Sequence, residues 1–461
     1  MNDIRHTLIS FLLLLLSAGP TSVFAQQDAE EQFKIGVRYE EGDSAQQDLK
    51  KAIEWFEKAA SQGHAAAQSR VGGYYLYGLG VEQDLKKGID FFEKSANQGF
   101  AKAQSNLALC YLEGRGVEKD TKKAFEWFVK SADQGDAIGQ NYLGLFYLNG
   151  LGVEQDQKKA YELFVKSADQ EFEVGQNNLG LCYEHGFGAR QDLKKAAEWY
   201  EKAANQGYSV SQYNLGLFYL NGYGVEQDLK KAFDLFEKSA SQGYAPAQCE
   251  LGAFYMNGEG ARRDPKKAFE WFEKSASQGY APAQKNLGTC YEHGYGVEPD
   301  IKKTAEWFEK AASQGYAQAQ CDLGLLYMNG EGVERDLKKA FDLFEKSASQ
   351  GYAPAQCNLG ASYEHGNGVE KDVKKAAELY EKAANQGDFQ AQFNLGLCYH
   401  YGRGVEKDTK KAVELFEKSA SQGHPQAQLN LSGFYEYGEG VEKDLEKAAY
   451  WKKMYEENPN K

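Results

Sequence analysis

Residues 65–100 read AAAQSRVGGYYLYGLGVEQDLKKGIDFFEKSANQGF, and this stretch decides the fold because variants of it fill almost the whole chain. One tyrosine marks the register, since it recurs every 36 residues. Its copies are Tyr39, Tyr75, Tyr111, Tyr147, Tyr183, Tyr219, Tyr255, Tyr291, Tyr327, Tyr363, Tyr399 and Tyr435. A fixed period of this length is typical of a solenoid, in which each unit buries its apolar face only against its neighbours.

The first half of this stretch has the pattern of a helix, which we call helix A. Ala67, Val71 and Tyr75 are spaced at i, i+4 and i+8 and therefore share one face. Gly78 follows where a helix commonly ends on a left-handed residue.

A second helix, helix B, is expected over residues 85–97. It follows Asp84, a position that is aspartate in all twelve units. An aspartate there can cap the helix by accepting hydrogen bonds from the amides of its first turn. Ile89, Phe92 and Ala96 form the apolar stripe of this helix. The pattern therefore predicts an all-α fold, an α-solenoid of about twelve helix-turn-helix repeats.

A glycine recurs inside helix A. It is found at Gly36, Gly72, Gly144, Gly180, Gly216, Gly252, Gly288, Gly324, Gly360 and Gly396. Glycine inside a helix costs roughly 0.5 to 1 kcal/mol relative to alanine, so its recurrence predicts close contact with another helix.

The region of residues 135–180 departs from the pattern. Glu171 replaces the glycine that ends helix B elsewhere, and Gly139 and Gly175 replace an alanine of helix A. We expect this region to be the softest joint of the array.

The first 25 residues also depart from the repeat. Arg5 and His6 precede an apolar run at residues 8–16, and Ala25 completes a motif typical of signal-peptide cleavage sites. The alternative is an uncleaved anchor, but the run is shorter than the roughly 20 residues that a span needs.

We therefore expect a signal peptide at residues 1–25, a repeat array at 26–447, and a C-terminal cap and tail at 448–461. The mature chain should be exported and have no membrane span. This means a periplasmic or secreted protein in a bacterium, or an endoplasmic-reticulum or extracellular protein in a eukaryote.

The charge distribution argues against nucleic acid as a partner. The formal net charge is −14, and lysines and arginines are spread through every repeat rather than gathered in one patch. Binding to the phosphate backbone requires a basic patch or stripe.

The seven cysteines occupy two repeat positions. Cys110, Cys182, Cys290 and Cys398 share a position that is otherwise mostly phenylalanine, so we expect buried thiols. Cys249, Cys321 and Cys357 share a position that elsewhere holds Ser69, Ser105, Asn141, Lys285 or Leu429, so we expect that position to tolerate water. Equivalent residues of packed helices lie roughly 8 to 10 Å apart, too far for a regular disulfide ladder, although this spacing leaves an irregular pair open. The odd count leaves at least one thiol free or in an intermolecular disulfide.

The unit at residues 283–315, AQKNLGTCYEHGYGVEPDIKKTAEWFEKAASQG, closely resembles the Sel1-like repeat. The resemblance covers almost the whole mature chain. It implies a tetratricopeptide-like α/α superhelix that is used as an adaptor surface. Many repeats of that family carry proline after the loop valine, where this chain has Glu82 and its equivalents.

A secreted, cysteine-rich group within that family pairs two cysteines in each repeat and has been linked with β-lactam hydrolysis. No repeat here holds two cysteines, and neither Ser-x-x-Lys nor Lys-Thr-Gly occurs in the sequence. Membership of that group is therefore not supported.

The best candidate site is a line of asparagines at one position of helix A. They are Asn106, Asn178, Asn214, Asn286, Asn358, Asn394 and Asn430. An asparagine both donates and accepts, so it can hold one peptide unit, and a repeat spacing of roughly 10 Å matches about three residues of extended chain. The same amides could instead bond a neighbouring helix. The presence of Arg70 and Tyr142 at this position favours a solvent-facing side.

Variable aromatic residues are further candidates. Tyr142, Tyr213 and Tyr401 could anchor a partner, or could pack within the groove, as we expect for Phe393. The histidines His185, His293 and His365 each stand alone in their repeat, so no metal site is predicted, and no motif indicates a cofactor.

The sequence thus predicts a non-catalytic, exported scaffold that binds a peptide segment or protein partner on the concave helix A surface. Two other classes stay open. One is a hydrolase of cell-wall or β-lactam compounds, and the other is a purely structural spacer.

Overall fold

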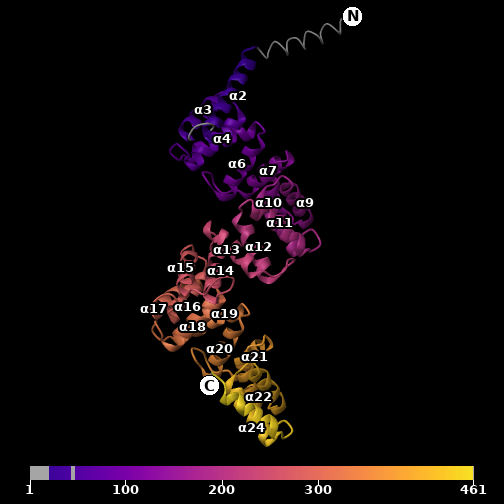
Figure 1. Ribbon diagram of the computed structural model, residues 1–461, viewed down its shortest axis with the longest axis vertical. Helices are drawn as coiled ribbons and strands as arrows, with labels where there is room; N and C mark the ends of the chain where they lie inside the picture. Colours follow the sequence, from indigo (N-terminus) through magenta and orange to yellow (C-terminus); the bar gives the residue numbers. More distant parts are fainter. Residues whose placement is uncertain (1–19, 43–46, 460) are drawn as a thin grey trace. The chain divides into compact units, whose positions relative to one another are not determined.

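The computed structural model describes residues 20–42, 47–459 and 461 (Figure 1). Residues 1–19, which carry most of the predicted signal peptide, lie outside the described residues. The described part contains 24 helices and no strand, which confirms the predicted all-α solenoid. None of the described helices combines the length and apolarity that a membrane span requires.

The helices alternate between the two types. Helix A of the successive repeats is α2 (Pro20–Glu41), α4 (Ala65–Tyr77), α6 (Ala101–Glu113), α8 (Ala137–Asn149), α10 (Glu173–His185), α12 (Ser209–Asn221), α14 (Ala245–Asn257), α16 (Ala281–His293), α18 (Ala317–Asn329), α20 (Ala353–His365), α22 (Phe389–Tyr401) and α24 (Pro425–Tyr437). Helix B is α3 (Leu49–Ser61), α5 (Leu85–Asn97), α7 (Thr121–Asp133), α9 (Gln157–Ala168), α11 (Leu193–Asn205), α13 (Leu229–Ser241), α15 (Pro265–Ser277), α17 (Ile301–Ser313), α19 (Leu337–Ser349), α21 (Val373–Asn385), α23 (Thr409–Ser421) and α25 (Leu445–Glu456).

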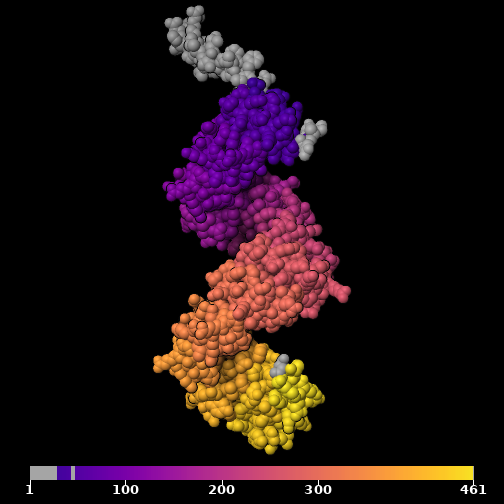
Figure 2. Space-filling model, turned by 90° about the vertical axis from the view of Figure 1, so that its left-hand side faces the viewer, coloured from indigo at the N-terminus to yellow at the C-terminus, as the bar shows by residue number. Residues whose placement is uncertain are grey.

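The chain divides into two compact units, residues 1–228 and 229–461. The repeat register shows no break at this division. Within each unit helix A packs on helix B of its own repeat, and helix B packs on the next helix A. The space-filling view shows the same order, since neighbouring colours within a unit touch one another (Figure 2).

The ends of the helices follow the predicted capping pattern. A carboxylate oxygen of Asp84 accepts from the Lys87 amide at 2.9 Å, and Gly78 ends helix A with φ 69°. Equivalent caps are formed by Asp48, Asp120, Asp156, Asp192, Asp264, Asp300, Asp336, Asp372, Asp408 and Asp444. The turn is closed by the main-chain carbonyl of the recurring tyrosine, since the Tyr75 carbonyl accepts from the Asp84 amide at 2.9 Å.

The glycine inside helix A faces an aromatic ring of helix B. A Cβ atom added at Gly72 would lie 2.7 Å from Cδ1 of Phe92, a fully buried ring. The same relationship is found at Gly36, Gly144, Gly180, Gly252, Gly288, Gly324, Gly360 and Gly396. In the last repeat both partners change together, to Ser432 and Lys452. The predicted close helix contact is therefore confirmed.

A glutamine pair, which sequence reasoning did not single out, joins three helices. Gln68 of α4 donates from Nε2 to the Ala60 carbonyl of α3 at 3.2 Å, and its Oε1 accepts from Gln98, at the end of α5, at 2.6 Å. Both positions are glutamine in the first eleven repeats. In the last repeat Asn458 takes the second position and donates to Gln428 Oε1 at 2.9 Å.

The region of residues 135–180 is closely packed. A Cβ atom at Gly139 would lie 2.6 Å from Ser131 Oγ, and one at Gly175 would clash with Ser167. Glu171 has φ 61° and is the one non-glycine residue with positive φ among those the structure describes. The departure at this joint thus includes left-handed backbone at one non-glycine residue, and the softness of the joint stays a prediction.

Candidate functional site

The asparagines of helix A contact the preceding helix A. In the first unit, Nδ2 of Asn178 donates to Asn141 Oδ1 at 2.8 Å, and Nδ2 of Asn214 donates to Asn177 Oδ1 at 3.1 Å. In the second unit the acceptors are thiols: Asn286 donates to Cys249, Asn358 to Cys321 and Asn394 to Cys357, at 3.6, 3.4 and 3.6 Å. Five of the seven asparagines therefore bond a neighbouring helix. Their binding to a partner stays a prediction.

The acceptor cysteines correct one expectation. Cys249, Cys321 and Cys357 are buried, so the position they share does not admit water in these repeats. The serines and asparagines found there in other repeats are also buried, because the position faces the next helix A. All seven cysteines are free and buried, and burial raises the pKa of Cys249, Cys321 and Cys357 to about 12.

The aromatic candidates differ in exposure. Tyr142 is half-buried and stacks on Phe128, with ring centroids 5.1 Å apart. Phe393 is buried and stacks on His424 at 4.4 Å, as expected for packing. Tyr213 is half-buried. Tyr401 is 61% exposed and retains the accessibility that a partner anchor requires.

The histidines at the ends of helix A lie beside carboxylates of the same turn. His185 Nε2 is 3.9 Å from Glu184, and His293 Nε2 is 3.5 Å from Glu292. Within residues 20–42, 47–459 and 461, no three potential ligands gather as a metal site would require.

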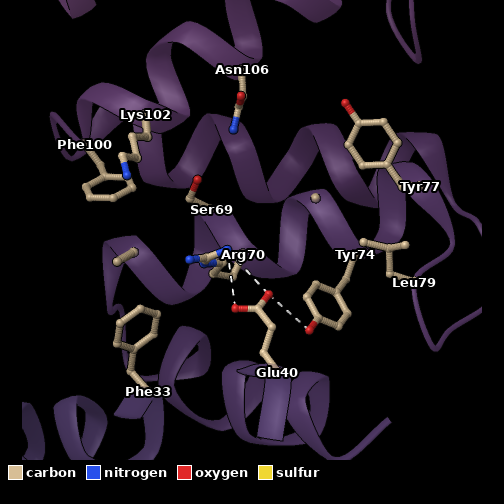
Figure 3. Close-up of a pocket in the computed structure, with 12 residues that line it drawn as sticks. Phe33, Glu40, Ser69, Arg70, Tyr74, Tyr77, Leu79, Phe100, Lys102 and Asn106 are labelled. Carbon is tan, nitrogen blue, oxygen red and sulfur yellow. Dashed lines mark hydrogen bonds and ion pairs between the residues drawn. The ribbon is translucent and has the colours of Figure 1, made fainter. Parts of the chain in front are cut away.

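A groove of about 390 Å³ lies on the helix A side of repeats 1 to 3 (Figure 3). We call it the repeat 2 groove. Three consecutive helices A line it: α2, α4 and α6. Its residues are Phe33, Glu40, Ala66, Ser69, Arg70, Gly73, Tyr74, Tyr77, Leu79, Phe100, Lys102 and Asn106. Asn106 is thus one predicted site residue that lines an open groove.

One side of the groove is organised by Glu40. Its Oε1 accepts from the Tyr74 hydroxyl at 3.2 Å, and its Oε2 lies 3.4 Å from Arg70 Nη1 (Figure 3). Burial and the adjacent carboxylate raise the pKa of Tyr74 above its ordinary value, so the phenol stays protonated and donates. These contacts hold Arg70, whose side chain is 53% exposed, at the groove.

One end of the groove is formed by Tyr77 and Leu79. Tyr77 is 57% exposed, and the Arg115 guanidinium of the next repeat lies 4.5 Å from its ring centroid. Leu79 is 42% exposed and stands between Gly78 and Gly80, both left-handed with φ 69°. Positive φ at the positions before and after Leu79 favours glycine at both. The resulting turn leaves the Leu79 side chain exposed.

A second groove, of about 260 Å³, lies on the helix A side of repeats 11 and 12. We call it the repeat 12 groove. It is lined by Leu397, His400, Tyr401, Leu429, Asn430, Gly433, Phe434, Tyr437 and Glu439. Asn430 and Tyr401 are the predicted site residues found here. Six of its residues, from Leu429 to Glu439, occupy the same repeat positions as Ser69, Arg70, Gly73, Tyr74, Tyr77 and Leu79.

Sequence reasoning missed Gly73, Tyr77, Gly433 and Tyr437. A signal was present, because ten of the twelve repeats carry a larger residue at the position of Gly73 and Gly433, and nine carry a residue other than tyrosine at the position of Tyr77 and Tyr437. Comparing the residues at each repeat position reveals this variation, whereas residues that recur in every repeat do not show it.

The family model and the similar solved structures both concern one kind of helical repeat. The Sel1 repeat model matches residues 32–64, 65–100, 101–136, 137–172, 174–208, 209–244, 245–280, 281–316, 317–352, 353–388, 389–424 and 425–451. The crystal structure of a protective antigen of uropathogenic Escherichia coli, which displays an SLR fold, is 36% identical, with a TM-score of 0.67. The match covers 93% of this chain and 92% of the antigen.

A Sel1 repeat protein from Oxalobacter formigenes is 33% identical, with a TM-score of 0.48 over 71% of this chain and 93% of that one. A search of curated proteins found no match.

Proposed function

Because this chain belongs to the Sel1 repeat family, we propose that it is a non-catalytic scaffold that binds a protein partner or peptide segment on the helix A face of its repeats. By the helix A face we mean the surface that carries the positions of Arg70, Gly73 and Tyr77 in each repeat. These positions are spaced at i, i+3 and i+7 and so lie on one side of the helix. Repeat solenoids of this kind mediate protein–protein interaction.

The repeat 2 groove is the observation that carries the proposal. It combines exposed apolar groups, Tyr77 and Leu79, with charged groups, Arg70 and Lys102. A protein-binding site typically has aromatic and arginine anchors at its centre and a polar rim. The frame around it is rigid, because the capping aspartates and glutamine pairs recur in the adjoining repeats.

The proposal is tested by site-specific photo-crosslinking in the native host. A photoreactive phenylalanine analogue is placed at Tyr77, at Leu79, or at Lys86 of α5 as an exposed control on helix B. We expect one partner to be cross-linked from Tyr77 and Leu79 and not from Lys86. Equal labelling from all three positions would contradict a helix A binding face. No specific product at any of them would favour a structural spacer.

We also propose that residues 1–25 direct export. The support is the apolar run at residues 8–16, followed by the motif that ends at Ala25. N-terminal sequencing of the protein from fractionated host cells should find Gln26 as the first residue. A cytoplasmic protein that retains residues 1–25 would contradict the proposal.

A further inference from the structure

We infer that the repeat 2 groove receives one bulky apolar side chain of a partner peptide, flanked by acidic residues. The inference rests on the proposed scaffold function and names the class of ligand. It comes from three features of the groove: a missing side chain, an exposed ring and a local excess of positive charge.

The missing side chain is at Gly73. At its repeat position the later helices A carry Leu109, Leu145, Leu181, Leu217, Ala253, Thr289, Leu325, Ala361, Leu397 and Gly433. Glycine thus stands at this position in repeats 2 and 12, the repeats on which the two helix A grooves are centred. The hollow lies where most repeats place a side chain of their own.

Gly73 differs in kind from its neighbour Gly72. A Cβ atom at Gly72 would clash with Phe92, so packing requires that glycine. A Cβ atom at Gly73 would meet nothing within 4 Å. Helical glycine costs roughly 0.5 to 1 kcal/mol, and no packing contact of the described residues offsets this cost at Gly73. A side chain supplied by a partner would fill the space that the glycine leaves.

The exposed ring is Tyr77. At its position the following eight repeats carry Glu113, Asn149, His185, Asn221, Asn257, His293, Asn329 and His365. Repeats 2 and 12 combine this tyrosine with the glycine one turn before it. The contact with Arg115 holds the ring of Tyr77 in place while leaving most of it exposed. A restrained aromatic ring offers a large contact area at a low entropic cost.

The charge of the groove selects among apolar ligands. Its lining contains two cations, Arg70 and Lys102, and one carboxylate, Glu40. Glu40 already bonds Arg70 and Tyr74, and Arg115, which is not part of the lining, lies against the ring of Tyr77 as a third cation nearby. This positive site lies within a chain of net charge −14. Acidic residues beside the apolar side chain are therefore complementary to it.

The repeat 12 groove provides an internal comparison. It has the same glycine and tyrosine, Gly433 and Tyr437, but its rim carries Glu439 where the repeat 2 groove has Leu79, and Asn430 where that groove has Arg70. An acidic peptide should therefore bind the repeat 2 groove more tightly than the repeat 12 groove.

The test uses the full mature chain and capped, fluorescent peptides in which Glu-Leu-Glu is flanked by glycine and serine. Binding is followed by fluorescence anisotropy. Gly73→Leu installs the residue of the next four repeats and fills the hollow, and Gly433→Leu is its matched control. We expect Gly73→Leu to weaken binding by about tenfold or more, which corresponds to about 1.4 kcal/mol, and Gly433→Leu to leave it unchanged.

Charge is tested separately. Arg70→Asn and Lys102→Gln install residues that other repeats carry at these positions. Each should weaken binding of the Glu-Leu-Glu peptide and reduce its dependence on salt, because exposed charges are screened by ions. A Lys-Leu-Lys peptide and a Glu-Ala-Glu peptide should bind at least about tenfold more weakly than the Glu-Leu-Glu peptide.

The inference is overturned if both leucine variants weaken binding equally, if neither does, or if the Lys-Leu-Lys peptide binds as tightly as the acidic one. Absence of all peptide binding, together with a partner cross-linked from Tyr77, would reject this ligand class and leave the scaffold function standing. Absence of a helix A cross-link in the host would reject the scaffold function itself, whatever the peptides do.

Discussion

Lys285 of α16 and Asp322 of α18 form an ion pair, with Nζ 3.6 Å from Oδ2, at the two positions that hold a cysteine and an asparagine in adjoining repeats. Elsewhere the same two positions carry two asparagines. The residues thus change as a pair that bridges consecutive helices A. In these repeats the residue at the asparagine position bonds the residue that it meets on the preceding helix A, so a polar residue at this position does not by itself indicate exposure to solvent.

This pairing predicts a coupled stability effect. Asp322→Asn leaves the Lys285 side chain, 23% exposed, without its carboxylate; because burial also raises the pKa of Asp322, the net loss in the free energy of unfolding should be small, about 1 kcal/mol or less. The double variant Lys285→Cys with Asp322→Asn recreates the neighbouring cysteine and asparagine pair and should recover most of the loss. Urea unfolding measures both. Additive losses in the double variant would show that the two positions are independent.

Two adjacent glycines of α4 should respond in opposite directions to the same substitution. Gly72→Ala forces a Cβ atom against the Phe92 ring and should destabilise the protein by about 1–3 kcal/mol. Gly73→Ala adds a Cβ atom in open space and should stabilise it by roughly 0.5–1 kcal/mol through helix propensity. Thermal and urea unfolding of the two variants provide the comparison. Equal effects at both positions would refute the distinction between a packing glycine and a groove glycine.

Replacing the strained residue that follows α9 should stabilise the protein. Glu171 has φ 61°, whereas Gly135 ends the preceding helix B with φ 88°. Glu171→Gly should raise the free energy of unfolding by about 1 kcal/mol, because glycine adopts this conformation without strain. Gly135→Glu, the reverse change in the preceding repeat, should lower it by a similar amount. A destabilised Glu171→Gly variant would mean that the glutamate makes a compensating contact.

Replacing Glu250 of α14 with glutamine should change the free energy of unfolding by an amount that depends on pH. Burial raises the pKa of its carboxyl in the folded protein, so at neutral pH the buried charge costs stability. Glu250→Gln should therefore be more stable than the wild type at pH 7. As pH falls through the raised folded pKa, the folded wild type takes up a proton before the unfolded chain does. The wild type then regains stability, so the advantage of glutamine should shrink. Urea unfolding across pH 4 to 7 tests this. A constant difference would exclude titration of Glu250.

The buried thiols should be slow to react in the folded protein. Burial raises the pKa of Cys182, Cys249 and Cys290 to about 12, so little thiolate exists near pH 8. Alkylation with iodoacetamide should be slow in buffer and fast in urea, as mass spectrometry of the labelled chain would show. Rapid labelling of one cysteine in buffer would identify a thiol able to form the intermolecular disulfide that the odd cysteine count leaves open.

Much of the fold could be read from the sequence because its determinants are local and repeated. The aspartate cap, the left-handed glycine and the helical spacing of Ala67, Val71 and Tyr75 act within one or two turns. Twelve copies of one pattern made each element unambiguous. The glutamine pair was equally regular but went unnoticed, because Gln68 and Gln98 are 30 residues apart and meet only after both helices pack.

The candidate site was predicted less well. The asparagine position was placed on the correct helix, yet five of its amides bond the preceding helix A. Asn106, Asn430 and Tyr401 do line grooves. Those grooves depend on Gly73 and Gly433, and from the sequence alone these two glycines do not look different from the recurring glycines that packing requires.

The sequence by itself determined the repeat, the two helices of each unit and the family, because periodicity and capping are properties of neighbouring residues along the chain. Only the tertiary structure decided which polar side chains are consumed by contacts between repeats and which glycine leaves an open hollow. Those outcomes depend on the side chain that a packed helix presents, and Gly72 and Gly73 show this directly: they are adjacent in sequence, but one faces Phe92 and the other faces open space.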